Sequence, residues 1–89
     1  MRAVLTVIGK DTVGILARVA AVCAAHNVNI SEVTQTVLDD LFCMIMMCDI
    51  GALDIGFAEF ADMLADTGRE MGLSIHVMHE DIFNSMHRI

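Results

Sequence analysis

The sequence predicts an α+β domain in which strands and helices follow one another as β-α-β-β-α-β. Four short apolar stretches have the length and composition of strands, and two longer segments repeat apolar residues at helical spacing. Two of the four stretches are apolar on both faces, whereas the other two are half polar. An antiparallel sheet with the first and third strands in the middle accounts for this difference, because central strands are covered more completely than edge strands.

The first strand is predicted over Arg2 to Ile8, where both alternating sets of side chains are largely apolar. Gly9 to Gly14 is expected to form a turn, with Asp11 or Thr12 capping the helix that follows. This helix is predicted from Val13 to His26, with alanines on its outward face. Its inward stripe consists of Ile15, Val19, Val22, Cys23 and His26.

The second strand is predicted over Ile30 to Leu38, where several polar side chains favour a position at the sheet edge. Asp39 and Asp40 are expected to form a tight hairpin turn into the third strand, Leu41 to Asp49. The third strand is apolar on both faces. This pattern favours a central place beside the first strand.

A loop is expected over Gly51 to Gly56, overlapping the start of a second helix predicted from Asp54 to Met71. Gly72 is expected to end this helix, because glycine readily adopts the left-handed conformation found after a helix. The last strand, Leu73 to His79, has polar residues on one face and is expected at the second edge. The inward residues of the second helix are Phe57, Phe60, Ala61, Leu64, Gly68 and Met71.

These elements fit a ferredoxin-like sandwich whose four-stranded antiparallel sheet has the spatial order 4-1-3-2 and carries two helices on one face. The second sheet face stays apolar and requires a partner surface. Ile82, Phe83, Met86 and Ile89 recur at helical spacing and predict a short C-terminal helix. We therefore divide the chain into a domain of residues 1–79 and a helical tail of residues 80–89, which packs on its own subunit or on a neighbour.

Composition restricts the function further. The 89 residues suffice for one domain, and a hydrophobic share of 56% predicts a homodimer or a higher homo-oligomer. A net charge of −7 without a basic patch argues against binding to nucleic acid or to an anionic membrane surface. The chain contains no apolar run of about 18 residues, the length that spans a membrane. The three cysteines lie in apolar runs and are expected to be buried thiols of a cytoplasmic protein.

The stretch from Gly9 to Leu16 is the predicted ligand site, because of its local chemistry. A strand that passes through a glycine-bounded turn directly into a helix leaves the first N–H groups of that helix unpaired. Such a helix start attracts anions, including carboxylates. The same glycines also suit a tight turn and close packing of helix on sheet, so both interpretations stay open.

Four segments of the chain resemble the ACT domain. They are G-K-D-T-V-G-I-L at Gly9 to Leu16, H-N-V-N-I at His26 to Ile30, Q-T-V-L-D-D-L-F at Gln35 to Phe42, and the tail H-E-D-I-F-N-S-M-H-R-I at His79 to Ile89. The whole set resembles stand-alone single-ACT-domain proteins of unknown function. The turn is also similar to that of the N-terminal ACT domains of formyltetrahydrofolate deformylases and of a glycine cleavage repressor.

This resemblance implies a regulatory module that binds a small molecule, often an amino acid, at a subunit interface. Backbone N–H groups at the helix start would hold the ligand carboxylate, and Asp11 or the Asn29 amide would accept its ammonium group. Asp11 also suits a helix cap and Asn29 a loop. Many amino-acid-binding members carry proline where this chain has Val13. The implied ligand-binding residues are Lys10, Asp11, Thr12, Val13, Gly14, Ile15, Asn29 and Ile30.

Two other functions stay open at this point. One is a ligand-free interaction module that uses the alanine face, an edge strand or the tail. The other is an acylphosphatase-like hydrolase with Arg18 at the phosphate, although the acidic balance repels such substrates and no catalytic set stands out. We expect that the protein is not an enzyme and that it binds no cofactor. A metal site is also not expected, because His76 and His79 fall on opposite faces of a strand.

Overall fold

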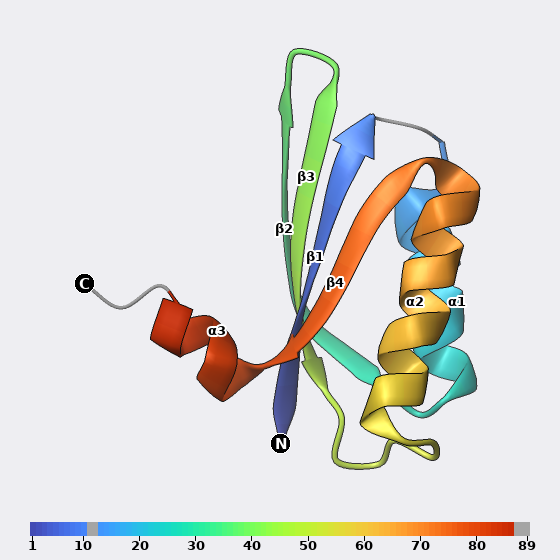
Figure 1. Cartoon of the computed structure of the whole chain (residues 1–89), viewed down its shortest axis with the longest axis vertical. Helices are drawn as coiled ribbons and strands as arrows, with labels where there is room; N and C mark the ends of the chain where they lie inside the picture. Colours follow the sequence, from blue (N-terminus) through green and yellow to red (C-terminus); the bar gives the residue numbers. More distant parts are fainter. Residues whose placement is uncertain (11–12, 87–89) are drawn as a thin grey trace.

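The computed structural model describes residues 1–10 and 13–86, and in this part of the chain it confirms the predicted order of elements. One antiparallel sheet contains β1 (Arg2–Lys10), β2 (Asn29–Leu38), β3 (Leu41–Asp49) and β4 (Leu73–His79) in the order β2-β3-β1-β4. The helices α1 (Ile15–Ala25) and α2 (Phe57–Met71) cover one face, and α3 (Glu80–Met86) projects from the other (Figure 1). The ferredoxin-like topology and the central places of β1 and β3 are confirmed.

The helix starts differ from the prediction. Because Gly14 adopts the left-handed conformation with φ 85°, it becomes the N-cap, and α1 begins at Ile15 rather than at Val13. No side chain makes the cap hydrogen bond of α1 among the described residues. The expected caps, Asp11 and Thr12, lie outside the part of the chain that the structure describes. The second helix, α2, also begins later than predicted, at Phe57 rather than at Asp54, and its N-cap Gly56 is extended with φ −64°.

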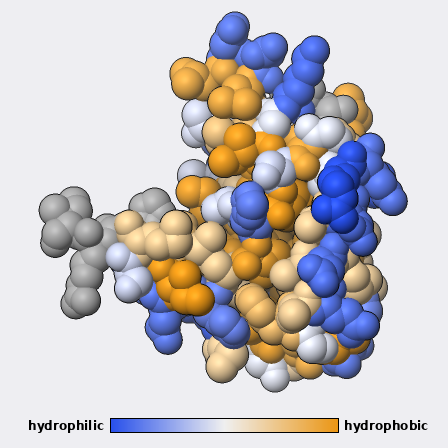
Figure 2. All heavy atoms as spheres, in the orientation of Figure 1, coloured by the Kyte–Doolittle hydropathy of each residue, from blue (hydrophilic) through white to orange (hydrophobic). Residues whose placement is uncertain are grey.

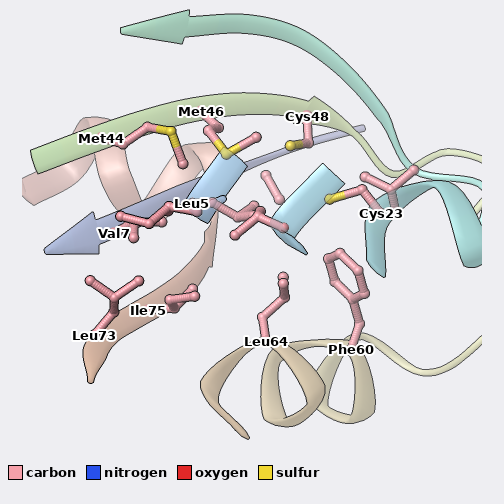
Figure 3. Packing of buried hydrophobic residues seen from close by; sticks show 14 of the residues in the cluster. Leu5, Val7, Cys23, Met44, Met46, Cys48, Phe60, Leu64, Leu73 and Ile75 are labelled. Atoms are coloured by element: carbon pink, nitrogen blue, oxygen red, sulfur yellow. The ribbon is translucent and has the colours of Figure 1, made fainter. Parts of the chain in front are cut away.

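The core lies between the sheet and the two long helices (Figure 3). Phe60 and Leu64 of α2 are fully buried, as is Val19 of α1, so the predicted inward faces are confirmed. One buried polar residue was not predicted. Thr67 is 9% exposed, and its Oγ1 donates a 3.0 Å hydrogen bond to the carbonyl oxygen of Met63, so its burial leaves no polar atom unpaired. The side chains that the sheet contributes to the core include Ala3, Leu5, Val7, Met44, Met46, Cys48 and Ile75.

The opposite sheet face is only partly covered. Val4 is fully buried although it alternates with the core residues of β1, and α3 contacts both β1 and β4 at this end of the sheet. The C-terminal helix therefore covers part of the second face. Toward the β2–β3 hairpin the face stays open, and hydrophobic residues extend along it (Figure 2). The large exposed side chains of this open face are Ile8, Leu38, Leu41 and Ile45.

None of the helices described by the structure combines the length and the apolar character that crossing a bilayer requires.

Candidate functional site

The turn between β1 and α1 presents backbone donors at the hairpin end of the sheet. Gly14 is the N-cap of α1 with φ 85°, and its carbonyl oxygen accepts a 3.0 Å hydrogen bond from the Arg18 N–H. The N–H groups of the first helical turn have no partner inside the helix, because their acceptors would precede it. Val13 is 98% exposed directly before this helix start. The described residues therefore leave Val13 uncovered beside the first amides of α1.

Gly9 and Gly14 favour glycine for different structural reasons. A Cβ on Gly9 would lie 2.7 Å from Cδ2 of Leu73 and 3.1 Å from the carbonyl oxygen of Gly72, so Gly9 permits close packing of β1 against the start of β4. A Cβ on Gly14 would meet nothing within 4 Å, and there the left-handed φ alone favours glycine. The close approach at Gly9 is therefore between neighbouring strands and not between a helix and the sheet. Gly14 combines a special backbone with open space beside it.

Ile15 belongs to the core. Its side chain is 3% exposed and packs among the buried residues under α1. The Ile15 side chain is therefore not available to a ligand, and only the backbone N–H of Ile15, at the helix start, could contact one. Lys10 is exposed at the end of β1, where it pairs with Leu41.

Within one chain, Asn29 and Ile30 do not lie near the turn. Asn29 pairs with Asp49, which pairs with Arg2 at the beginning of β1, whereas the turn follows Lys10 at the other end. The pairing places Asn29 and Lys10 about 26 Å apart along the strands. A ligand that contacts both parts of the predicted site must therefore lie between two chains.

Arg18 points toward α2. Its Nη2 lies 2.6 Å from Oε2 of Glu70, and both side chains are at least half exposed. This ion pair neutralises the guanidinium that the hydrolase interpretation places on a phosphate. Nothing in this arrangement favours phosphate-ester chemistry at the turn.

Two surface cavities lie outside the predicted site. One of about 560 Å³ is lined by Met1, Arg2 and the first residues of α3, at the end of the sheet far from the turn. The other, of about 460 Å³, follows the edge of β4 from Gly72 to His76 and also contacts Arg69. Neither lining contains a residue of the predicted ligand site.

The sequence model of the ACT domain family matches residues 2–78. The chain belongs to the ACT domain family. A UPF0237 protein of Listeria monocytogenes is 49% identical over 89 residues, covering 100% of both chains. ACT domains are generally regulatory ligand-binding modules.

Solved structures show the same ACT fold. An ACT domain protein from Streptococcus pneumoniae superposes with a TM-score of 0.81 at 31% identity, covering 98% of each chain. A formyltetrahydrofolate deformylase from Pseudomonas putida matches with a TM-score of 0.76 at 15% identity, covering 88% of this chain and 28% of that chain. The second likeness shows the fold alone. It places the ACT fold within part of a larger enzyme.

The histidines of this ACT domain interact individually with neighbouring side chains. The ring of His79 stacks on Phe57 with centroids 4.0 Å apart, while Nε2 of His76 lies 3.0 Å from Oγ of Ser74. Nδ1 of His26 lies 2.8 Å from Oδ1 of Asp54, a contact that sequence spacing could not reveal because 28 residues separate the two. His87 lies outside the described residues. Within the described ranges, no three histidine, cysteine or acidic side chains gather as a metal site.

Two cysteines meet inside the core. Cys23 of α1 and Cys48 of β3 are 1% and 0% exposed, as predicted for buried thiols. The hydrogen bond with Cys23, together with burial, raises the pKa of the Cys48 thiol. Cys48 is therefore kept protonated. The third cysteine, Cys43, is half-buried on the open face of the sheet.

Proposed function

We propose that this ACT domain is a cytoplasmic, non-catalytic regulatory module that binds an amino acid between two copies of the chain. The observation that supports the proposal most is the start of α1. Gly14 leaves the first amides of the helix without a side-chain cap among the described residues, and Val13 beside them is 98% exposed. A helix of eleven residues that begins in this way offers several N–H donors and a positive dipole end to a carboxylate.

The ligand amine requires acceptors that the helix start does not supply. Asp11 is the acceptor nearest in sequence, and the amide oxygen of Asn29 is a second one. Because Asn29 lies at the far end of its own sheet, it serves the site only when a second copy contributes it. The proposed site therefore uses Lys10 to Ile15 of one chain and Asn29 with Ile30 of the other.

Such a site converts binding into regulation. A ligand held between two chains stabilises the arrangement of the dimer that binds it more tightly. The size of this effect equals the difference in binding free energy between the two arrangements. A protein that contacts the dimer would then respond to the amino acid concentration.

An interaction module without a ligand is the second candidate. The exposed apolar side chains of the open sheet face favour it, since Ile8, Leu41 and Ile45 are each at least 40% exposed. Both candidates require a dimer or another partner. Ligand binding separates them.

Thermal-shift measurements with the individual amino acids test the proposal. At 10 mM ligand and a Kd of about 1 mM, linkage stabilises the folded chain by about 1.4 kcal/mol, which raises Tm by several degrees for a domain of this size. The corresponding amines, which lack the carboxylate, should produce no shift. Flat curves with every amino acid would leave only the interaction module.

Val13→Glu sharpens the experiment. The new carboxylate would stand beside the first amides of α1, where repulsion of about 1 kcal/mol weakens binding of a carboxylate roughly fivefold. The folded chain should keep or slightly increase its Tm, because an acidic residue at a helix start is favourable. Val37→Glu is the matched control, since Val37 is also exposed but lies on β2. Equal loss of binding in both variants would contradict the proposed site.

A further inference from the structure

Cys23 of α1 and Cys48 of β3 meet in the core between the helices and the sheet. Their side chains point toward one another, and a hydrogen bond joins the two thiols (Figure 3). They are 1% and 0% exposed, so other parts of this chain surround them completely. The proposed function makes no use of this pair, which brings two nucleophilic atoms together inside the fold.

The backbone holds both cysteines in place. Cys48 pairs with Ala3 of β1 on one side and with Ile30 of β2 on the other. The carbonyl oxygen of Cys23 accepts a 2.9 Å hydrogen bond from the Val28 N–H, which links the end of α1 to the segment before β2. A disulfide places its sulfur atoms about 2.05 Å apart. Thiols that already share a hydrogen bond reach this separation by small side-chain rotations and a slight approach of α1 to the sheet.

The two thiols differ in acidity. The hydrogen bond from Cys48 lowers the pKa of Cys23, although burial opposes this change. The proton stays on Cys48, whose pKa the same contact raises. Because the thiolate is the nucleophilic form, Cys23 is the sulfur that attacks an oxidant, and Cys48 is the sulfur that then completes the disulfide.

The end of α1 offers a route to the pair. Cys23 lies in the last turn of this helix, and helix ends fray. The loop after β3 lies at the same end of the domain (Figure 1), and its Leu53 and Ile55 pack on the core. Nδ1 of His26 lies 2.8 Å from Oδ1 of Asp54, which joins this loop to the end of α1. Local opening here exposes Cys23 to a small molecule while the sheet stays folded.

Hydrogen peroxide suits this route because it is uncharged and little larger than water. A bulky thiol reagent requires a larger opening of the core, and anionic oxidants such as glutathione disulfide are repelled by a net charge of −7. The Cys23 thiolate attacks one peroxide oxygen and the O–O bond breaks, which leaves a sulfenic acid, while the released hydroxide takes up the proton that Cys23 lost. The Cys48 sulfur then attacks the sulfenic sulfur. The S–S bond forms, the S–O bond breaks, and the hydroxyl group leaves with the Cys48 proton as a second water.

We infer that Cys23 and Cys48 form a redox-sensitive pair, which hydrogen peroxide converts into a disulfide through local opening at the end of α1. The disulfide joins α1 to β3 and closes a loop of about 25 residues. Since it constrains the unfolded chain, the oxidised protein should have a Tm roughly 10–20 °C above that of the reduced protein. This inference goes beyond the proposed function and does not require an amino acid to bind.

Mapping the disulfide in the full chain gives the first test. After peroxide treatment of the native chain, alkylation of the remaining thiols and digestion, mass spectrometry should find Cys23 joined to Cys48. The same treatment in urea should favour Cys43 with Cys48, because these two are closest in sequence and close the shortest loop. A native chain that forms mainly the Cys43–Cys48 bond, mainly intermolecular bonds of Cys43, or no disulfide would overturn the inference.

Stability gives the second test in a Cys43→Ser background, which removes the half-buried thiol and isolates the pair. Peroxide should raise Tm, and dithiothreitol should return it to the reduced value. Adding Cys48→Ala leaves Cys23 without a partner thiol and should abolish the rise. If the oxidised and reduced Cys43→Ser chains shared one Tm, the pair would be a packing feature without redox chemistry.

The rate of oxidation tests the route. Asp54→Ala removes the contact with His26 and should speed formation of the Cys23–Cys48 bond several-fold. Glu70→Ala is the matched control, because it removes another exposed contact of α1, the ion pair with Arg18, nearer the start of the helix. Its rate should equal that of the parent chain. Equal rates in all three chains would refute entry at the end of α1.

Discussion

Gly68→Ala is expected to destabilise this domain although it improves the helix propensity of α2. Gly68 is buried where α2 packs on β4. A Cβ at this position would lie 2.9 Å from the carbonyl oxygen of Leu73 and 2.9 Å from Cγ1 of Ile75. Real Cβ atoms essentially never come so close to other heavy atoms.

Two opposing effects determine the magnitude. Replacing glycine by alanine inside a helix gains about 1 kcal/mol of propensity. Overpacking a filled core costs about 1–3 kcal/mol, and the upper part of that range applies because one of the two contacts is backbone. Leu73 is held in β4 by its pairing with Gly9, so relief requires α2 to move away from the sheet. The net loss is about 1–2 kcal/mol, or a fall in Tm of roughly 5–10 °C for a domain of this size.

Urea denaturation followed by far-ultraviolet circular dichroism measures this change, with all variants at one protein concentration. Gly56→Ala is the control, because a Cβ there meets nothing within 4 Å and its φ of −64° suits any residue. Replacing the N-cap glycine lowers the stability of the control variant slightly. The reduced flexibility of its unfolded chain raises the stability by a similarly small amount. If Gly68→Ala raised Tm by about 4 °C, propensity would outweigh packing and the reasoning would fail.

Three further predictions concern single side chains. Gly14→Ala should lower stability by about 1–2 kcal/mol through backbone strain alone, measured by the same urea titration, because no clash accompanies its φ of 85°. Arg18→Ala should lower the free energy of unfolding by less than about 1 kcal/mol, since the Arg18–Glu70 ion pair is exposed. A larger interaction energy in a double-mutant cycle of Arg18→Ala with Glu70→Ala would contradict this expectation. In dilute native protein a thiol reagent should modify Cys43 first, with Cys23 and Cys48 reacting only on unfolding. Cys43→Ser should remove the fast phase, and raising the protein concentration should slow it if the open face is covered by a second copy.

Local patterns were sufficient for much of the fold. The bounds of β3 and β4 follow from alternation and apolar runs that neighbouring residues define by themselves. Asp39 in the hairpin turn has φ 60°, and Gly72 after α2 has φ 73°. Both conformations depend on the residue type and on the next few residues, so the sequence displays them directly.

The ligand site shows the limit of such patterns. The sequence identified the turn from Gly9 to Gly14 and the start of β2 as one predicted site, but it could not place them relative to each other. The register of the sheet puts Asn29 beside Asp49 and Arg2, at the end opposite Lys10. Only strand pairing determines this separation, because it depends on which residues of distant segments exchange hydrogen bonds.

The sequence by itself determined the kinds of element, their order and the family, since these rest on periodicity, turn residues and short motifs. Tertiary structure decided the close approach at Gly68 and the His26–Asp54 contact. It also decided that α3 covers Val4 while Ile8 and Ile45 stay exposed. These features depend on the distance between segments far apart in the chain, which arises only when the helices and the sheet pack together.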